Sequence, residues 1–160
     1  MKAAKFVISC LWIAVGVTSA ETTLLPAGGE TTWRYLDGKA IPGEGWTASG
    51  FDDSEWKKGK APLGYGKDDV ETRILFGDDP GNKPLTAYFR ATFQAPPKGE
   101  NEFTKLGLMV SYDDGVSVYL NGEEVARGNL EEGPLTPESA AIIAVRESGE
   151  LVTTIPTGSL

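Results

Sequence analysis

The sequence predicts an all-β fold, an antiparallel β-sandwich or jelly roll. Twenty glycines and ten prolines recur every few residues, and these residue types favour turns over long regular elements. No stretch keeps apolar residues at the i, i+3, i+4 and i+7 spacing of a helix. Instead, about seven short runs alternate apolar and polar residues between turn signals, which is typical of a core enclosed between two sheets.

The clearest predicted strand covers residues 105–112. Leu106, Leu108 and Val110 alternate there with glycine, methionine and serine, so one face of the strand is apolar and is expected to pack on the core. Two aspartates and a glycine at residues 113–115 then predict a turn.

A hairpin is predicted after this turn. Val116, Val118 and Leu120 alternate with polar residues and indicate a second strand. The Asn-Gly pair at 121–122 accepts the positive φ angles of a type I′ turn, and residues 123–127 return as the partner strand.

Four further runs are predicted as strands from their alternation or their β-branched content. The four runs are residues 32–36, 86–94, 140–145 and 151–155. Trp33 and Tyr35 fall on one side of the first run, and Phe89 and Phe93 fall on one side of the second.

A long turn-rich region follows the first strand. Asp52 and Asp53 can accept hydrogen bonds from backbone N–H groups one or two residues further on, which predicts a short turn that carries Trp56 inward. Gly64 and Gly66 allow backbone segments to approach closely. Because a structureless loop of this length is uncommon in a compact domain, we expect its aromatic residues to fix it across one end of the sandwich.

The N-terminal residues have the pattern of an export signal. Lys2 and Lys5 are basic, residues 6–17 are apolar, and small residues lead up to Ala20, so we expect cleavage after Ala20. A helix with a rise of about 1.5 Å per residue would be too short here to span the roughly 30 Å apolar core of a membrane. The chain is therefore expected to be secreted, periplasmic or on the cell surface.

The composition excludes several kinds of chemistry. The chain of 160 residues has no histidine, which excludes a Ser-His-Asp triad and a histidine-ligated zinc site. Its one cysteine, Cys10, lies in the predicted export signal, so the mature chain would have neither a disulfide nor a Cys-ligated zinc. Removing residues 1–20 takes away two lysines and no acid, which changes the net charge from −8 to −10. Such an acidic domain is not expected to bind nucleic acid or an anionic membrane surface.

An ordered series of motifs runs through residues 31–160. Its members are Trp33-x-Tyr35-Leu36-Asp37, Gly45-Trp46, Phe51-Asp52-Asp53-Ser54-x-Trp56, Ala61-Pro62-Leu63-Gly64-Tyr65-Gly66, Thr86-x-Tyr88-Phe89-Arg90, Asp113-Asp114-Gly115-x-x-x-Tyr119-Leu120-Asn121-Gly122 and Arg127-x-Asn129-Leu130-x-x-Gly133. The series resembles the galactose-binding-domain-like β-sandwich modules of large exported bacterial proteins, which often stand beside metallophosphatase or other extracellular domains. The resemblance implies a non-catalytic jelly roll over residues 31–160, preceded by a lead-in at residues 21–30.

The sequence departs from this family at its C-terminal end. In the family, a segment like residues 151–160 leads through a Gly-Asn turn into a final apolar strand, whereas here the chain stops at Leu160. The domain is therefore expected to lack its last strand, which would leave a sheet edge unpaired.

Asp113 and Asp114 are the candidate metal ligands. The same Asp-Asp-Gly stretch resembles PA14 adhesins, in which such a pair holds a calcium ion that binds sugar hydroxyls, since hard oxygen ligands suit Ca²⁺. The alternative is an ordinary turn in which the aspartates accept hydrogen bonds from local N–H groups. Calcium needs about 6–8 oxygen ligands, and the sequence assigns no second ligand loop.

Three residues are candidates for ligand binding: Trp46, Tyr65 and Arg90. Aromatic rings can stack on the apolar face of a sugar, but large rings also fill the core of a small sandwich. For Arg90, the alternative to a ligand role is an ion pair with a carboxylate on a neighbouring strand.

The expected function is non-catalytic binding of carbohydrate or another extracellular ligand. The first alternative is a spacer module without a ligand, covalently joined to a catalytic domain such as a metallophosphatase. A small glycosidase is the third hypothesis, because two carboxylates alone can hydrolyse a glycoside, although nothing in the sequence sets two of them apart.

Overall fold

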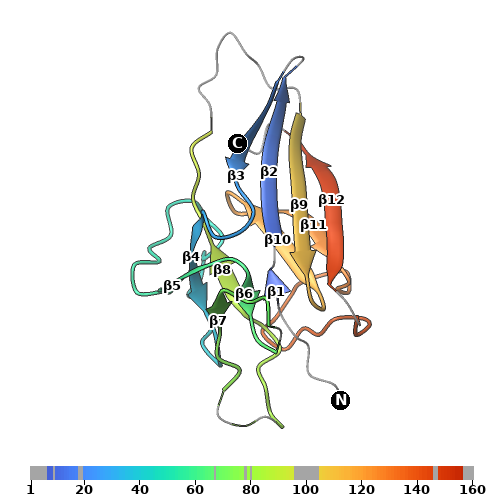
Figure 1. The fold of residues 1–160 in the computed structure, drawn as a ribbon. Coiled ribbons are helices and arrows are strands. Elements are labelled where there is room, and N and C mark those ends of the chain that lie inside the picture. The colour runs from blue at the N-terminus through green and yellow to red at the C-terminus, as the bar shows by residue number, and fades with distance from the viewer. Residues whose placement is uncertain are drawn as a thin grey trace.

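Every regular element in the described part of the chain is a β-strand. The computed structural model (Figure 1) describes residues 7–8, 10–17, 20–66, 68–77, 79, 81–95, 105–145 and 148–156, with the backbone alone for residues 7–21, and these residues include no helix. The strands are β1 Val7–Ile8, β2 Cys10–Val17, β3 Ala20–Leu25, β4 Thr32–Leu36, β5 Lys57–Lys60, β6 Leu63–Gly64, β7 Thr72–Arg73, β8 Tyr88–Arg90, β9 Lys105–Tyr112, β10 Val116–Leu120, β11 Glu123–Gly128 and β12 Gly149–Ile155.

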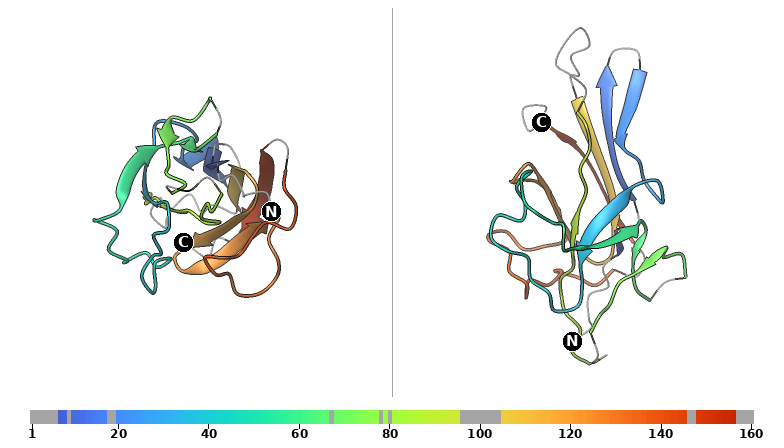
Figure 2. Two further views of the ribbon diagram at one scale, coloured as in Figure 1. Left: turned by 90° about the horizontal axis from the view of Figure 1, so that it is seen from below. Right: turned by 90° about the vertical axis from the view of Figure 1, so that its left-hand side faces the viewer.

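The strands form four small sheets around a common interior (Figure 2). The largest sheet is antiparallel and has the order β12-β9-β2-β3, and a second antiparallel sheet has the order β5-β4-β8. β10 and β11 form a hairpin, while β1, β6 and β7 form a small sheet in which β6 and β7 are parallel. The predicted all-β class is confirmed, and the antiparallel sheets are consistent with a β-sandwich.

The core lies between the β9 sheet and the β4 sheet. Leu106, Leu108 and Val110 on β9 are at most 1% exposed, and Trp33 and Tyr35 on β4 belong to the same cluster of buried side chains. Each fully buried aliphatic side chain contributes about 1.5–3 kcal/mol relative to an exposed one. The predicted apolar faces of both strands are confirmed.

The predicted hairpin is also confirmed. β10 and β11 pair antiparallel from Val116 opposite Gly128 to Leu120 opposite Glu123. Asn121 and Gly122 have φ angles of 51° and 96°, which is the left-handed backbone of a type I′ turn.

Two other predicted strands are present with different lengths. β12 includes the predicted residues 151–155 and pairs antiparallel with β9. β8 covers only three residues of the predicted 86–94, because it pairs with β4 no further than Arg34 opposite Arg90. Residues 91–95 continue without a ladder partner among the described residues.

The strand predicted at residues 140–145 is wrong. This run forms a single bridge, Ala141 opposite Leu130, and Ile142 and Ile143 are 55% and 63% exposed. Asn129 makes the hydrogen bonds that a neighbouring strand would make: Ile143 N donates to Asn129 Oδ1 at 3.2 Å, and Asn129 Nδ2 donates to the Ile143 carbonyl at 2.7 Å. The Asn129 side chain therefore bonds the backbone groups of Ile143, while the Asn129 carbonyl accepts a hydrogen bond from Ile142 N at 3.1 Å.

The turn predicted around Asp52 is confirmed. Ser54 N donates to Asp52 Oδ1 at 3.0 Å, and Trp56 N donates to the Asp53 carbonyl at 3.0 Å. Trp56 is 7% exposed, so the turn carries its ring into the interior as expected.

The N-terminal backbone takes part in the largest sheet. β2 pairs antiparallel with β9, from Cys10 opposite Ser111 to Gly16 opposite Lys105, and also with β3. The predicted lead-in at residues 21–30 therefore contains most of a strand. Export and cleavage after Ala20 stay predictions, and cleavage there would cut the chain at the first residue of β3. Lys2, Lys5 and residues 157–160 lie outside the described residues.

Candidate functional site

A cleft of about 350 Å³ opens beside β8 and β10. Residues 41–46 of the turn-rich region form one wall, residues 86–89 and 115–119 form the floor, and residues 135–139 form the opposite wall. Ligand pockets usually measure about 300–1,000 Å³, so this cleft suits a small molecule or the end of a chain.

Trp46 is the central aromatic side chain of the cleft. Its ring meets Tyr88 edge to face at a centroid distance of 5.2 Å and Tyr119 at 5.7 Å. All three side chains are half-buried and line the cleft. The arrangement presents aromatic surface from three separate segments to one space.

Arg90 holds the backbone of Trp46 in place. Its Nη1 donates a hydrogen bond to the Trp46 carbonyl, and its Nε forms an ion pair with Asp53 Oδ2 at 2.9 Å. The Arg90 side chain is only 10% exposed, so this pair is partly shielded from water. The prediction that Arg90 pairs with a carboxylate is confirmed, although the partner belongs to a turn and not to a neighbouring strand.

Hydroxyl groups supply the polar part of the cleft. Ser117 comes from β10, whereas Thr136 and Ser139 come from the opposite wall. That wall is held by a turn in which Thr136 N donates to Ser139 Oγ at 2.8 Å, and Thr86 Oγ1 fixes it to the start of β8 by donating to the Pro137 carbonyl at 2.9 Å. A hydroxyl that accepts one hydrogen bond still has a proton to donate, so Ser139 can act as a donor to a ligand.

The phenol of Tyr88 stays protonated at physiological pH. Burial raises its pKa above the ordinary value of 10.0, and the negative charge of Glu138 raises it further. Tyr88 therefore offers the cleft a neutral O–H group together with the edge of its ring.

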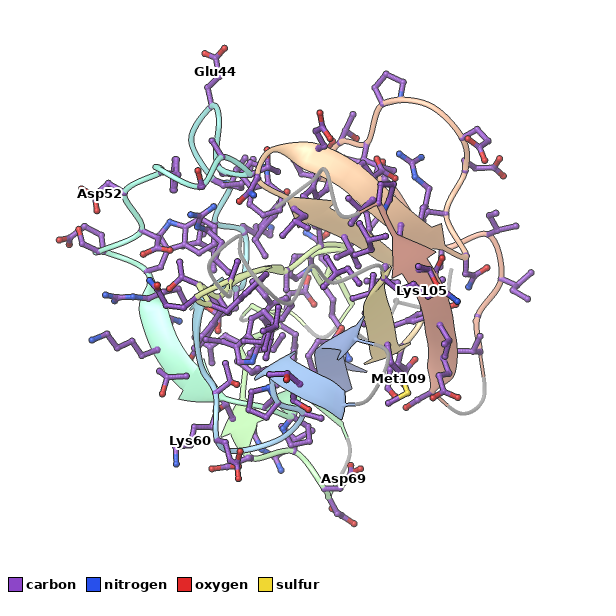
Figure 3. The ribbon with its side chains drawn as sticks, turned by 90° about the horizontal axis from the view of Figure 1, so that it is seen from above. Glu44, Asp52, Lys60, Asp69, Lys105 and Met109 are labelled. Carbon is purple, nitrogen blue, oxygen red and sulfur yellow. The ribbon has the colours of Figure 1, made fainter. Side chains whose placement is uncertain are left out.

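Glu44 is the one acidic residue among those that line the cleft. Its side chain is exposed at the tip of a projecting loop, as Figure 3 shows. A glycosidase of the usual kind needs two carboxylates that flank the bond to be cleaved, and the described lining does not supply such a pair. The described lining of the cleft consists mainly of aromatic, hydroxyl-bearing and small apolar residues.

Tyr65 lies apart from Trp46 and Arg90. It is 6% exposed, its ring lies 5.3 Å from that of Phe76, and Lys83 Nζ lies 5.2 Å from its centroid. It does not line the cleft. Burial raises its pKa, and the charges of Asp113 and Asp114 raise it further, which places it beside the Asp-Asp turn.

Asp113 and Asp114 form a buried turn between β9 and β10. They are 3% and 4% exposed. Val145 N donates to Asp114 Oδ1 at 2.7 Å, and Asn129 Nδ2 donates to the Asp114 carbonyl at 2.8 Å. Within the described residues, no three His, Cys, Asp or Glu side chains gather closely enough to hold a metal ion. The two donors are distant in the sequence, and one is a side-chain amide, so they are not the local N–H groups of the alternative expectation.

Sequence reasoning did not single out Tyr119 or the hydroxyls of residues 136–139 as site residues. Tyr119 carried a usable signal, because it lies between Val118 and Leu120, where strand alternation places an aromatic ring on the outer face. The hydroxyls carried none, since they come from a loop whose position depends on contacts distant in sequence.

The comparisons with known proteins add no relative. No family model matches the chain, and neither does any curated protein or solved structure. In the described part of the chain, no helix has the length and apolar character needed to cross a membrane.

Proposed function

We propose that this chain is an exported, non-catalytic β-sandwich module of the galactose-binding, jelly-roll type, and that its cleft binds carbohydrate. The observation that carries the proposal is the placement of Trp46, Tyr88 and Tyr119 around one cleft whose opposite wall bears hydroxyl groups. Sugars combine an apolar ring face with a rim of hydroxyls. Aromatic rings complement the first and serine or threonine hydroxyls complement the second.

The lack of strong charge in the cleft favours a neutral ligand. Its lining has one charged side chain, the exposed carboxylate of Glu44, and its other polar groups are hydroxyls and backbone groups, while Arg90 is engaged by Asp53 and by the Trp46 carbonyl. A neutral sugar needs no counter-charge, whereas a phosphate or carboxylate ligand would lack a cationic partner in this lining.

A spacer module without a ligand, joined to a catalytic domain such as a metallophosphatase, is the second candidate. It is favoured by the ring contacts of Trp46, which also reaches Trp56 at a centroid distance of 6.3 Å. Such contacts are those of an ordinary aromatic cluster. The two candidates differ in one measurable property, saturable binding of a sugar.

Calcium at Asp113 and Asp114 is proposed only as an accessory to sugar binding. Double replacement Asp113→Asn and Asp114→Asn should abolish any rise in melting temperature that calcium causes, because a ligand stabilises only the state that binds it. No rise in the parent chain would remove calcium from the proposal.

A glycan array with the purified chain, with and without calcium, tests the proposed function. We expect binding to at least one neutral plant, algal or bacterial polysaccharide. Tyr88→Ala should weaken that binding about tenfold or more, because a stacking and donor group is lost. The matched pair Tyr88→Phe and Tyr65→Phe removes one hydroxyl inside and one outside the cleft, and only the first should affect binding. Silence across the array would favour the spacer function.

A further inference from the structure

The hydroxyl-bearing wall of the cleft, residues 135–139, is part of a loop. β11 ends at Gly128, and residues 129–139 include no strand. Thr136 N donates to Ser139 Oγ, and Ser139 N donates to the Thr136 carbonyl. These bonds shape the turn itself and do not connect it to a sheet. The position of the wall therefore depends on side chains that tie the loop to the strands.

Arg127 ties the start of this loop to β11. Its Nη1 donates to the Glu131 carbonyl and also to the Gly133 carbonyl, the second at 2.9 Å. A guanidinium nitrogen of this kind carries two N–H groups, so each carbonyl can have its own donor. Gly133 has a φ of 99°, a backbone conformation that favours glycine. The chain thus turns at the residue that Arg127 holds, two residues before the wall begins.

Glu124 fixes the guanidinium of Arg127. Glu124 Oε1 accepts a hydrogen bond from Arg127 Nε at 2.5 Å, and Oε2 accepts one from Nη2 at 2.6 Å. Such a two-bond pair between planar groups restricts the orientation of both side chains. With the two loop carbonyls, four of the five N–H groups of Arg127 have an acceptor. Arg127 is therefore engaged within the protein and is suited to position a loop.

The Glu124 carboxylate also meets the aromatic side of the cleft. The Tyr119 hydroxyl donates to Glu124 Oε2 at 3.4 Å. In the hairpin, Tyr119 stands opposite Glu124 and Ser117 stands opposite Arg127. Tyr119 and Ser117 line the cleft, whereas Glu124 and Arg127 do not. The ion pair is therefore beside the cleft, and it contacts both a ring of the cleft and the loop that carries the opposite wall.

We propose that the Glu124–Arg127 pair positions the hydroxyl wall of the cleft relative to its aromatic residues. The ligand side of this inference rests on the proposed sugar binding, because a sugar that contacts both surfaces binds best when they are already in place. Thr86 holds the wall further along, by donating to the Pro137 carbonyl. Loss of Arg127 should therefore loosen the segment before Pro137 and leave the rest of the loop attached.

The geometry predicts that lysine cannot replace arginine here. Arg127→Lys keeps the positive charge, but a single ammonium group cannot reach both oxygens of Glu124 and both loop carbonyls at once. Arg127→Lys should therefore resemble Arg127→Gln. A role that depends on charge alone would leave Arg127→Lys like the parent chain.

The first test needs no sugar. Backbone order parameters measured by NMR relaxation on the full chain should fall at residues 131–136 in Arg127→Gln and Arg127→Lys, from about 0.85 to about 0.6 or less. Glu124→Gln should cause a smaller fall, because the amide can still accept one of the two hydrogen bonds. Glu123→Gln removes an exposed carboxylate next to Glu124 and is the matched control. It should leave these order parameters unchanged.

The second test measures sugar binding by calorimetry with the best sugar from the array. Arg127→Gln and Arg127→Lys should weaken binding about tenfold or more, whereas Glu123→Gln should have no effect. The melting temperature should change little in each variant, because surface ion pairs contribute little to stability. Weaker binding would then reflect the position of the wall and not unfolding.

Three results would overturn the proposal. The first is unchanged order parameters at residues 131–136 in Arg127→Gln, and the second is sugar binding that stays intact although these order parameters fall. The third is an Arg127→Lys variant that matches the parent chain in both tests. If Arg127→Gln does not fold, Glu124→Gln decides the question. A parent chain that binds no sugar would refute the proposed function, while the order parameters would still decide whether the pair positions the wall.

Discussion

β8 and β10 border two cavities with different linings. The first cleft has one wall from residues 41–46 and another from residues 135–139, and both walls are loops. A second cavity, of about 280 Å³, includes strand residues such as Leu108 and Val110, each 1% exposed, in its lining. The same pair of strands therefore borders both cavities, but only the second is lined by these core residues of β9.

The difference follows from where the lining residues come from. Loop residues present hydroxyls and backbone groups that no ladder uses, and they supply binding functions more often than strands do. Strand residues that face the interior are apolar because they also form the core. We therefore expect the proposed sugar to occupy the first cleft, although the two cavities share Trp46, Phe89, Val116, Ser117 and Tyr119.

The largest expected effect comes from the ion pair that supports both cavities. Asp53→Ala removes the carboxylate from Arg90, whose side chain is 10% exposed, and should lower the free energy of unfolding by about 3 kcal/mol. Because Arg90 also holds the Trp46 carbonyl, the binding of sugar should weaken as well. Urea unfolding and calorimetry measure the two effects.

Asp52→Ala is the control for this change. Asp52 accepts a hydrogen bond from Ser54 N in an exposed turn, so its loss should lower the free energy of unfolding much less than the loss of Asp53. Equal losses for the two aspartates would show that the Arg90 pair does not support the cavities.

A smaller effect is expected from a substitution beside the cleft. A Cβ added at Gly115 would lie 2.9 Å from Leu130 Cδ2 and 3.1 Å from the Asn129 carbonyl. Gly115→Ala should therefore destabilise the fold by about 2 kcal/mol through overpacking, and it should weaken sugar binding. Gly50→Ala, where a Cβ meets nothing within 4 Å, should cause no loss in thermal unfolding. Unchanged sugar binding in Gly115→Ala would argue against the cleft.

Much of the segment from residue 105 to residue 127 could be predicted from the sequence because its contacts are local. The run at residues 105–112 has a period of two, and Asn121-Gly122 closes the next hairpin without help from distant residues. The strand at 140–145 was predicted from composition, which does not reveal that Asn129 would take the backbone groups of Ile143.

The candidate site was predicted less completely for the same reason. Trp46 was identified from its residue type, and it does lie in the cleft. Tyr65 has the same chemistry but packs beside Phe76, and no local pattern distinguishes these two positions. The partners of Trp46 on β8 and β10 are distant in sequence, so only the fold brings them together.

An effect smaller than that of Gly115→Ala is expected in the loop after residue 139. Asn129 has a φ of 54°, so Asn129→Gly keeps the backbone allowed and removes only the side-chain hydrogen bonds to Ile143 and to the Asp114 carbonyl. The free energy of unfolding should fall by about 1–2 kcal/mol. Hydrogen exchange at Ile143 should become faster, whereas Asn121→Gly at a similar φ should leave this amide unchanged. Slow exchange at Ile143 in Asn129→Gly would contradict this role.

The smallest effect on stability concerns the ion pair between Glu124 and Arg127. The hydrogen bond from Arg127 holds the pKa of Glu124 below its ordinary value of 4.5. The ionised pair therefore stabilises the fold above about pH 4.5, and this contribution is lost as the pH falls through the lower pKa of the folded state. Ion pairs at the protein surface contribute little to stability, so the effect should be small. Glu124→Gln should flatten the acid limb of a stability–pH curve, and Glu123→Gln should not.

The most direct test of the account is an NMR titration of the full chain with the best sugar from the array. The account predicts that the sugar shifts the Trp46 indole and Tyr88 but not Phe93 or Val125. A sugar that shifts none of the cleft residues would contradict the assignment of sugar binding to the cleft.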